Sequence, residues 1–229
     1  MRSLRPCHLH VTPAALVLAL VACGGAPSAT RPDGVPVPGG GGPAPVVVAL
    51  GDSLTAGPGL RREETYPARL QERIDARGYR HRVVDAGVSG DTTAGGLRRL
   101  EPALVPDTRV LIVALGANDG LGGVPVDQVR QNLSRIIEQA IQRKIKVLLT
   151  GMETPPTRGW QYTLDFHMIF PDLAVRFGVP LMPFLLTGVV GDTAFNLADG
   201  IHPNAAGARR IAENMWPYLE PLLIETNGG

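Results

Sequence analysis

A serine, a histidine and an aspartate from two distant segments could together perform acyl transfer. Ser53 stands in Gly51-Asp52-Ser53-Leu54, and Asp199 precedes His202 by three residues in Asp199-Gly200-Ile201-His202-Pro203. A serine hydroxyl is a poor nucleophile until a neighbouring base takes its proton. One tight turn can bring the Asp199 carboxylate to one imidazole nitrogen while the other nitrogen faces Ser53. The set predicts Ser53 as nucleophile, His202 as base and Asp199 as the orienting acid.

Two other histidines follow the N-terminal segment, and neither is as well placed to act as the base. His81 stands between Arg80 and Arg82, so we expect it on the solvated surface. His167 lies in a helical pattern, where packing or surface exposure is expected, although a place at the border of the pocket stays open. His202 lies in a predicted loop, which favours it as the base.

The oxyanion formed by nucleophilic attack needs preorganised hydrogen-bond donors. The candidates are the backbone N–H of Ser53, the backbone N–H of Gly90 and the side-chain amide of Asn118. Gly90 offers its backbone without a Cβ in the way. Asp52 adjoins the nucleophile, and we assign it to holding the loop.

The elements that must position these residues are predicted from hydrophobic patterns. Continuous apolar runs, typical of strands buried on both faces, occupy 46–50, 109–115 and 146–150, with weaker runs at 82–85 and 179–182. Helical patterns occupy 66–77, 126–143, 162–176 and 205–223, and Pro217 should kink or restart the last of these. The alternation predicts parallel βαβ units in one α/β domain, with the site at the carboxyl ends of the strands.

Four polar, glycine-bearing loops should therefore meet on one rim, at residues 51–57, 87–92, 116–120 and 199–204. Each loop taken alone is also ordinary turn or helix-cap chemistry. Together they supply a hydroxyl, an imidazole, a carboxylate, an amide and free backbone N–H groups, which are the parts of an acyl-transfer site.

Composition and charge exclude some other classes. The chain has 229 residues, a hydrophobic fraction of 44% and a charged fraction of 19%, as in soluble globular proteins. The formal net charge of +1 provides no basic field for a nucleic acid.

The N-terminus has the pattern of an exported protein. Arg2 and Arg5 precede an apolar run at 11–22 that is too short to cross a bilayer comfortably, which predicts a signal peptide over residues 1–22. An uncleaved anchor or a wrongly chosen start codon is the alternative. Leu20-Val21-Ala22-Cys23 resembles the lipobox of bacterial lipoproteins, which predicts lipid attachment at Cys23.

The two cysteines and the following segment fit this organisation. A disulfide between Cys7 and Cys23 would stabilise no core, so we do not favour it. Residues 23–45 are rich in Gly and Pro and predict a tether, followed by the domain at 46–225. Cleavage would change the formal charge from +1 to −1, so any membrane attachment would rest on lipid chains. We expect an exported bacterial protein, periplasmic or anchored at the outer membrane, and a monomer.

The loop motifs resemble the blocks of the SGNH, or GDSL, hydrolases. The resemblance rests on Gly51-Asp52-Ser53-Leu54, Gly90, Gly116-Ala117-Asn118-Asp119 and Asp199-Gly200-Ile201-His202-Pro203. It implies a flavodoxin-like three-layer α/β/α sandwich with a mainly parallel five-stranded sheet. It also implies the Ser53, Asp199 and His202 triad, the Gly90 and Asn118 oxyanion donors, and no metal or cofactor. The Gly-x-Ser-x-Gly elbow of α/β-hydrolases is absent.

Within that family the chain is similar to the thioesterase I, protease I and lysophospholipase L1 group and to related arylesterases. That group commonly has Gly-Gly-Asn-Asp where this chain has Ala117, which restricts the loop backbone. The resemblance implies hydrolysis of aryl esters or short to medium acyl esters, with lysophospholipids or thioesters as further substrates. The alternatives are a carbohydrate esterase that deacetylates glycans and a binding lipoprotein with an inactive site.

Overall fold

The predicted strands form one sheet. A computed structural model describes residues 42–227 of the chain. Its strands are β1 (Val46–Gly51), β2 (Arg82–Gly87), β3 (Thr108–Ala114), β4 (Lys146–Thr150) and β5 (Leu181–Met182). They pair in the order β2-β1-β3-β4-β5, and every pairing is parallel. This confirms the predicted five-stranded sheet, with the weak run at 179–182 reduced to a short edge strand.

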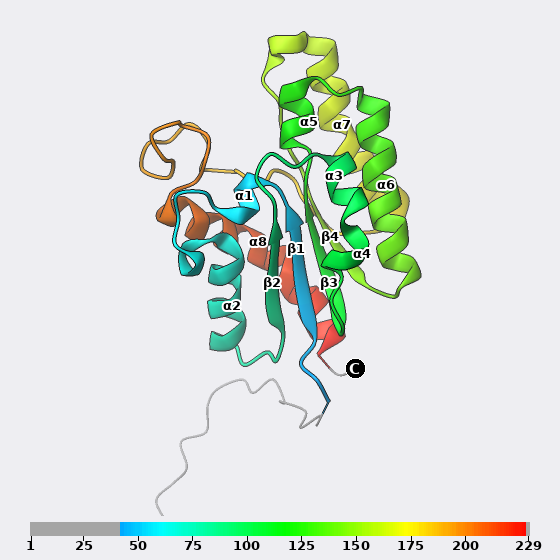
Figure 1. The fold of residues 1–229 in the computed structure, drawn as a ribbon, viewed down its shortest axis with the longest axis vertical. Coiled ribbons are helices and arrows are strands. Elements are labelled where there is room, and N and C mark those ends of the chain that lie inside the picture. The colour runs from blue at the N-terminus through cyan, green and yellow to red at the C-terminus, as the bar shows by residue number, and fades with distance from the viewer. Residues whose placement is uncertain (1–41, 228–229) are drawn as a thin grey trace, which may run out of the picture. The chain divides into compact units, whose positions relative to one another are not determined.

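Helices cover both faces of the sheet (Figure 1). The helices that cover the faces are α2 (Tyr66–Ala76) and α8 (Ala205–Thr226) on one face, and α3 (Thr93–Arg98), α6 (Val126–Gln142) and α7 (Trp160–Phe177) on the other. Short elements lie in the connections: α1 (Ser53–Ala56), α4 (Leu100–Ala103), α5 (Ala117–Gly122), and the 3-10 turns η1 (Arg62–Glu64) and η2 (Pro156–Arg158). The strand order and the two helical layers confirm the predicted flavodoxin-like sandwich.

The burial of each strand explains its sequence. β1 lies between β2 and β3 and is buried along its whole length, so both faces of the strand require apolar side chains. β2 lies at the edge of the sheet, and each of its residues is exposed or half-buried. The weaker apolar pattern at 82–85 is therefore the pattern of an edge strand.

The helix does not restart at Pro217, because α8 runs from Ala205 to Thr226 without a break. A proline inside a helix leaves the carbonyl four residues earlier without its N–H donor. Pro217 and Glu213 are both exposed, so that carbonyl lies where water can hydrate it. The helix can therefore continue through the proline and cover β3 and β4 as one element.

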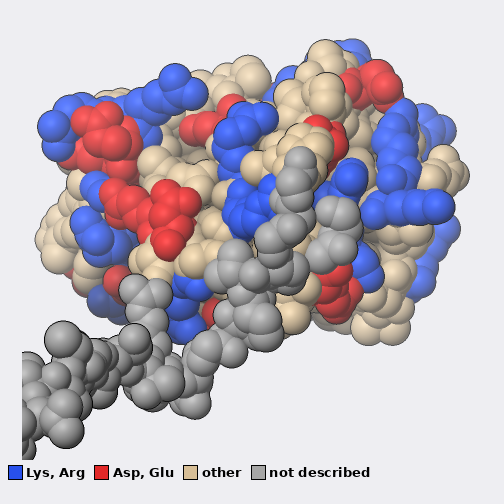
Figure 2. Space-filling model, turned by 90° about the horizontal axis from the view of Figure 1, so that it is seen from below, with Lys and Arg blue, Asp and Glu red and all other residues tan. Residues whose placement is uncertain are grey.

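The parallel order places every strand's carboxyl end on the same rim. α1 follows β1 at this rim, and the segment that precedes α8 (orange in Figure 1) lies at the same end of the sheet. The opposite pole holds the amino ends of the strands and the point where the chain enters β1 (Figure 1). Figure 2 shows this pole, where basic and acidic side chains are interspersed, as in the Lys146–Glu225 ion pair of 2.7 Å.

Membrane-spanning helices and metal-binding clusters can be assessed for residues 42–227. Between residues 42 and 227, no helix is both long enough and apolar enough to cross a membrane. Within the same range, no three His, Cys, Asp or Glu side chains are grouped so that they could hold a metal ion. The predicted leader at 1–22, Cys23 and the tether up to residue 41 lie outside the described residues.

Candidate active site

Ser53 is held at the carboxyl end of β1 by a tight strand-to-helix turn. Asp52 caps α1, since its Oδ1 accepts a hydrogen bond of 2.9 Å from the Leu54 N–H. Gly51 has no room for a side chain, because an ideal Cβ there would lie 1.9 Å from Thr55 Oγ1. The turn therefore places Ser53 as the first residue of α1, and Asp52 holds the loop as expected.

Three of the predicted site residues form a continuous hydrogen-bonded series. His202 Nε2 lies 3.0 Å from Ser53 Oγ, and His202 Nδ1 lies 2.6 Å from Asp199 Oδ2. The imidazole can thus face the serine with one nitrogen while the other nitrogen donates to the carboxylate. This is the geometry in which an imidazole can take a proton from a serine hydroxyl.

The loop that carries Asp199 and His202 is closed by its own hydrogen bonds. Asp199 Oδ1 accepts the N–H groups of Ile201 and His202, each at 2.9 Å, and the Leu197 N–H donates to the His202 carbonyl at 2.8 Å. Hydrogen bonds from the His202 ring first, and then from these backbone N–H groups, lower the pKa of Asp199 to about 2. Asp199 therefore stays ionised at neutral pH and fixes the tautomer of the imidazole.

The loops that carry the expected oxyanion donors lie against each other. Gly90 has a φ of 79° in a turn closed by the Asp91 N–H and the Val88 carbonyl at 3.0 Å, so the closing bond leaves the Gly90 N–H unused. Asn118 Nδ2 donates to the Asp91 carbonyl at 2.8 Å and lies 3.4 Å from Asp52 Oδ2. The Asn118 amide thereby links the residue after Gly90 to the residue before Ser53.

The alanine in the third loop requires no strained backbone. Gly116 has a φ of 124° and stands immediately before α5, so the glycine takes the conformation that L side chains rarely adopt. Ala117 is the first residue of α5 and is half-buried. The Ala117 methyl group therefore lies on the first residue of a helix, and Gly116 alone adopts the positive φ that the turn requires.

Asp52 is a buried carboxyl beside this site. Burial raises the pKa of Asp52 to about 6, with smaller upward contributions from the charges of Asp91 and Asp119 and an opposing one from the Leu54 N–H. Its side chain is fully buried. Asp52 thus titrates near the lower end of the physiological range while it caps α1.

The structure corrects the placement of His81. We expected it on the solvated surface, but it is only 1% exposed, and its Nε2 lies 2.8 Å from Thr226 Oγ1 near the end of α8. Burial, with a smaller contribution from the Arg80 charge, lowers the pKa of His81 to about 4. His167 is exposed, as one reading allowed, and its Nδ1 lies 2.7 Å from Glu153 Oε1.

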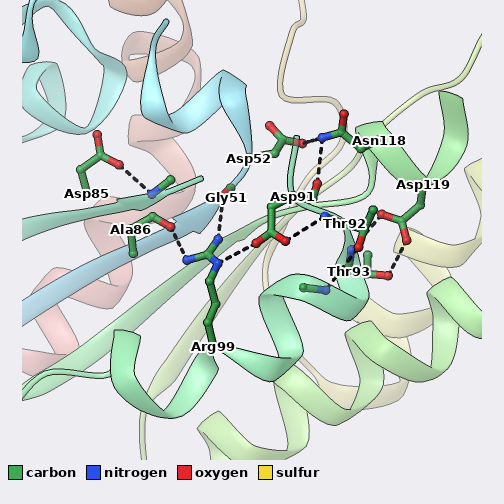
Figure 3. Close-up of polar contacts among 12 residues, drawn as sticks. Gly51, Asp52, Asp85, Ala86, Asp91, Thr92, Thr93, Arg99, Asn118 and Asp119 are labelled. Atoms are coloured by element: carbon green, nitrogen blue, oxygen red, sulfur yellow. Dashed lines mark hydrogen bonds and ion pairs between the residues drawn. The ribbon is translucent and has the colours of Figure 1, made fainter. Parts of the chain in front are cut away.

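Sequence reasoning did not identify two residues that support the loops of the site. Arg99, between α3 and α4, donates to the Asp91 carboxylate and to two strand-end carbonyls, as Figure 3 shows. Asp91 could have been identified from the sequence, because it directly follows the proposed oxyanion donor Gly90. Nothing in the sequence pattern marks Arg99, because two of its three acceptors are main-chain oxygens.

Comparison with known proteins gives a consistent family assignment. A family model described as the GDSL-like Lipase/Acylhydrolase family matches residues 49–210. Esterase TesA of Pseudomonas aeruginosa is 42% identical over 182 residues, which cover 79% of this chain and 90% of that protein. Thioesterase 1/protease 1/lysophospholipase L1 of Escherichia coli K12 is 37% identical over 182 residues, covering 79% of this chain and 86% of the relative.

Solved structures agree with these relatives. The psychrotrophic esterase EstA from a Pseudoalteromonas species, inhibited by monoethylphosphonate, superposes with a TM-score of 0.74. That structure is 29% identical in sequence, and the match covers 78% of this chain and 98% of the esterase. The match therefore extends over nearly the whole of that esterase.

Proposed function

Because the chain belongs to the GDSL-like lipase/acylhydrolase family and is an ester hydrolase, we propose that it cleaves carboxylic acyl esters with Ser53 as nucleophile. The observation that carries the proposal is the hydrogen-bonded series from Asp199 through His202 to Ser53 Oγ. No other histidine between residues 42 and 227 forms a hydrogen bond with Ser53, since His81 faces Thr226 and His167 faces Glu153.

The proposed reaction proceeds through an acyl-enzyme. Ser53 Oγ attacks the ester carbonyl carbon while His202 Nε2 takes the hydroxyl proton. His202 then gives this proton to the leaving oxygen as the bond between the acyl carbon and that oxygen breaks. A water molecule attacks the acyl-enzyme, His202 accepts its proton and returns it to Ser53 Oγ, and the carboxylic acid leaves. Ionised Asp199 stabilises the imidazolium at each step.

Charge on the carbonyl oxygen develops during both attacks. The Ser53 and Gly90 N–H groups and the Asn118 amide are the proposed donors to this oxyanion. Asn118 Nδ2 has two hydrogens, of which one is used by the Asp91 carbonyl at 2.8 Å. The second makes only the long 3.4 Å contact with Asp52 Oδ2, and we propose that the substrate oxyanion replaces this contact.

Apolar side chains on the rim loops support acyl or aryl esters as substrates. Val88, Leu121 and Ile201 are between 47% and 52% exposed, and each stands within three residues of a proposed site residue. Such side chains can cover an acyl chain or an aromatic ring. We propose aryl esters and short to medium acyl esters first, with lysophospholipids and acyl thioesters as further substrates.

Labelling and kinetics test the mechanism. An organophosphonate should label the protein on Ser53, and Ser53→Ala should lose both labelling and hydrolysis of p-nitrophenyl esters. Ser89→Ala, which removes an exposed serine on a neighbouring loop, should still be labelled on Ser53. Unchanged hydrolysis by Ser53→Ala would contradict the mechanism. A panel of esters that varies chain length and leaving group then defines the substrate class.

Export and anchoring are part of the same proposal. We propose a leader at 1–22, a lipid-bearing Cys23 with a tether to residue 45, and the catalytic domain at 46–225, in the periplasm or at the outer membrane. Cys23→Ser should release the protein from the membrane fraction. A wild-type protein that is already free of membranes, with an unmodified N-terminus, would overturn the lipoprotein assignment.

A further inference from the structure

Arg99 joins the ends of two strands to the loop that carries Gly90. Its Nε donates to Asp91 Oδ2 at 2.6 Å, its Nη1 to the Ala86 carbonyl at 2.6 Å and its Nη2 to the Gly51 carbonyl at 2.7 Å. Figure 3 shows the guanidinium among these three acceptors. Since Gly51 ends β1 and Ala86 lies in β2, one planar group fixes the relative positions of the loops that follow both strands.

Asp91 lies between Arg99 and two of the proposed oxyanion donors. It follows Gly90 directly, and its N–H closes the turn around that glycine. Its carbonyl accepts the Asn118 Nδ2 donor at 2.8 Å, and its Oδ1 accepts the Thr92 N–H at 3.0 Å. The position of Asp91 therefore determines where both donors lie.

The Asp91–Arg99 pair is held tightly by its surroundings. The side chains of Asp91 and Arg99 are only 11% and 22% exposed, so solvent screens the pair less than the surface pairs of this protein. An ideal Cβ on Gly95 would lie 1.6 Å from Asp91 Oδ1, so the backbone of α3 packs directly on the carboxylate. Gly95 and Arg99 together therefore leave the carboxylate little room to move.

Arg99 also pairs with one of the carboxylates near the site. The carboxyl groups of Asp91 and Asp119 are near enough to Asp52 for their charges to raise its pKa further, after the larger effect of burial. Unpaired negative charge at this place would oppose the negative charge that develops on the ester carbonyl oxygen. The guanidinium compensates the Asp91 charge at 2.6 Å.

We propose that Arg99 and Asp91 are positioning residues for ester hydrolysis, whose ion pair holds the Gly90 N–H and the Asn118 amide where the oxyanion forms. The inference rests on the proposed function, because it requires the Ser53 reaction. The pair acts through Gly90 and Asn118 and not by touching the ester. Its loss should therefore weaken binding of the transition state more than binding of the substrate.

The test compares Arg99→Gln, Arg99→Lys and Asp91→Asn with wild type in p-nitrophenyl butyrate hydrolysis. We expect kcat to fall about 10- to 100-fold, less than the roughly 100- to 1000-fold loss typical of removing a donor outright, with KM within about twofold. The inhibition constant of a trifluoromethyl ketone, whose adduct carries an oxyanion, should rise in proportion to the loss in kcat/KM. Arg99→Lys should retain more activity than Arg99→Gln because it keeps the charge.

Arg130→Gln is the matched control, since it breaks a 2.9 Å ion pair with Asp172 that joins α6 to α7. It should leave kcat and ketone inhibition at wild-type values. If Arg99→Gln does not fold, Arg99→Lys and the nearly isosteric Asp91→Asn carry the test. A lowered Tm with kcat and ketone inhibition unchanged in those two variants would overturn the inference, since the pair would then be structural only.

Different results would refute the proposed function and the positioning role of Arg99 and Asp91. A wild-type protein without esterase activity, or a Ser53→Ala variant with full activity, would refute the proposed function itself. An active wild type that depends on Ser53, together with Arg99 and Asp91 variants of undiminished kcat, would refute the positioning role alone.

Discussion

Asp199 Oδ2 lies 2.6 Å from His202 Nδ1, while Oδ1 of the same carboxylate accepts the N–H groups of Ile201 and His202. One carboxylate thus orients both the ring and the backbone of the proposed base. Because Asp199 is half-exposed and its partners are all within four residues, this arrangement belongs to the loop and needs no distant support. The loop can therefore be tested as a unit by changes at Asp199.

Asp199→Asn should lower kcat by about 10⁴-fold with little change in KM. The amide keeps the shape of the carboxylate but can present N–H to His202, which favours the wrong imidazole tautomer and no longer stabilises the imidazolium. Steady-state kinetics on a p-nitrophenyl ester measure the effect. Asp192→Asn changes an exposed carboxylate of the same connection and should keep wild-type kcat. A loss below tenfold at Asp199 would argue against its role.

Asp52 should make the protein less stable as pH rises from about 4 to 6. Burial raises its pKa from 3.8 to about 6, so the folded protein holds this proton more tightly than the unfolded chain does. The stabilisation is therefore complete below the unfolded pKa and is lost as pH rises through the folded one. The expected loss is about 3 kcal/mol in the free energy of unfolding. Urea unfolding should show that the stability of wild type relative to Asp52→Asn falls by this amount across the range; a difference that stays constant with pH would refute the prediction.

His81 should have the opposite effect. Burial, together with the Arg80 charge, lowers its pKa from 6.5 to about 4, so the folded protein favours the neutral ring. Its stabilisation is complete above pH 6.5 and is lost as pH falls through 4, by about 3 kcal/mol in total. The stability of wild type relative to His81→Gln should therefore fall by this amount as pH drops from 6.5 to 4, while His167→Gln, changed at an exposed site, should follow wild type. A difference between wild type and His81→Gln that does not change with pH would contradict the role of His81.

These two slopes oppose each other between pH 4 and 6. Wild type can therefore show a nearly flat stability profile there, even though both groups titrate anomalously. Between pH 4 and 6, the stability of Asp52→Asn should rise with pH and that of His81→Gln should fall with pH. The stability of the double variant should again be nearly constant.

Gly207→Ala should displace the segment that carries the proposed base. An ideal Cβ at Gly207 would lie 2.1 Å from the Phe195 carbonyl oxygen, and Gly207 also donates to the Asn204 cap of α8. We expect a loss of about 1–3 kcal/mol in unfolding free energy together with a lower kcat. Gly122→Ala is the control, since its Cβ would meet nothing within 4 Å. Thermal unfolding and ester hydrolysis measured on both variants decide the matter; equal values would contradict the predicted clash.

The sheet and the loops of the site could be predicted because their signals are local. A strand buried on both faces must be apolar throughout, which is why residues 109–115 coincide with β3 to within one residue. The loops at the strand ends are marked by glycines and polar side chains, and the parallel order places them on one rim without further information. The weak run at 82–85 was explained only when β2 proved to be an edge strand.

The features that were missed depend on contacts between distant segments. His81 has arginines on both sides in sequence, but Thr226 near the end of α8 covers it from 145 residues away. Arg99 reaches the Gly51 and Ala86 carbonyls, and a main-chain acceptor has no side-chain signature. Pro217 was expected to kink or restart its helix, yet α8 is unbroken there, and the solvent-facing position of Pro217 makes the loss of one hydrogen bond tolerable.

The chain enters β1 at Val46, at the amino ends of the strands, while Ser53 lies at their carboxyl ends. Anything coupled upstream of Val46, whether a lipid, a fusion partner or a solid support, therefore attaches at the pole farthest from the reacting serine. Immobilisation through the N-terminus should leave the rim open to dissolved esters.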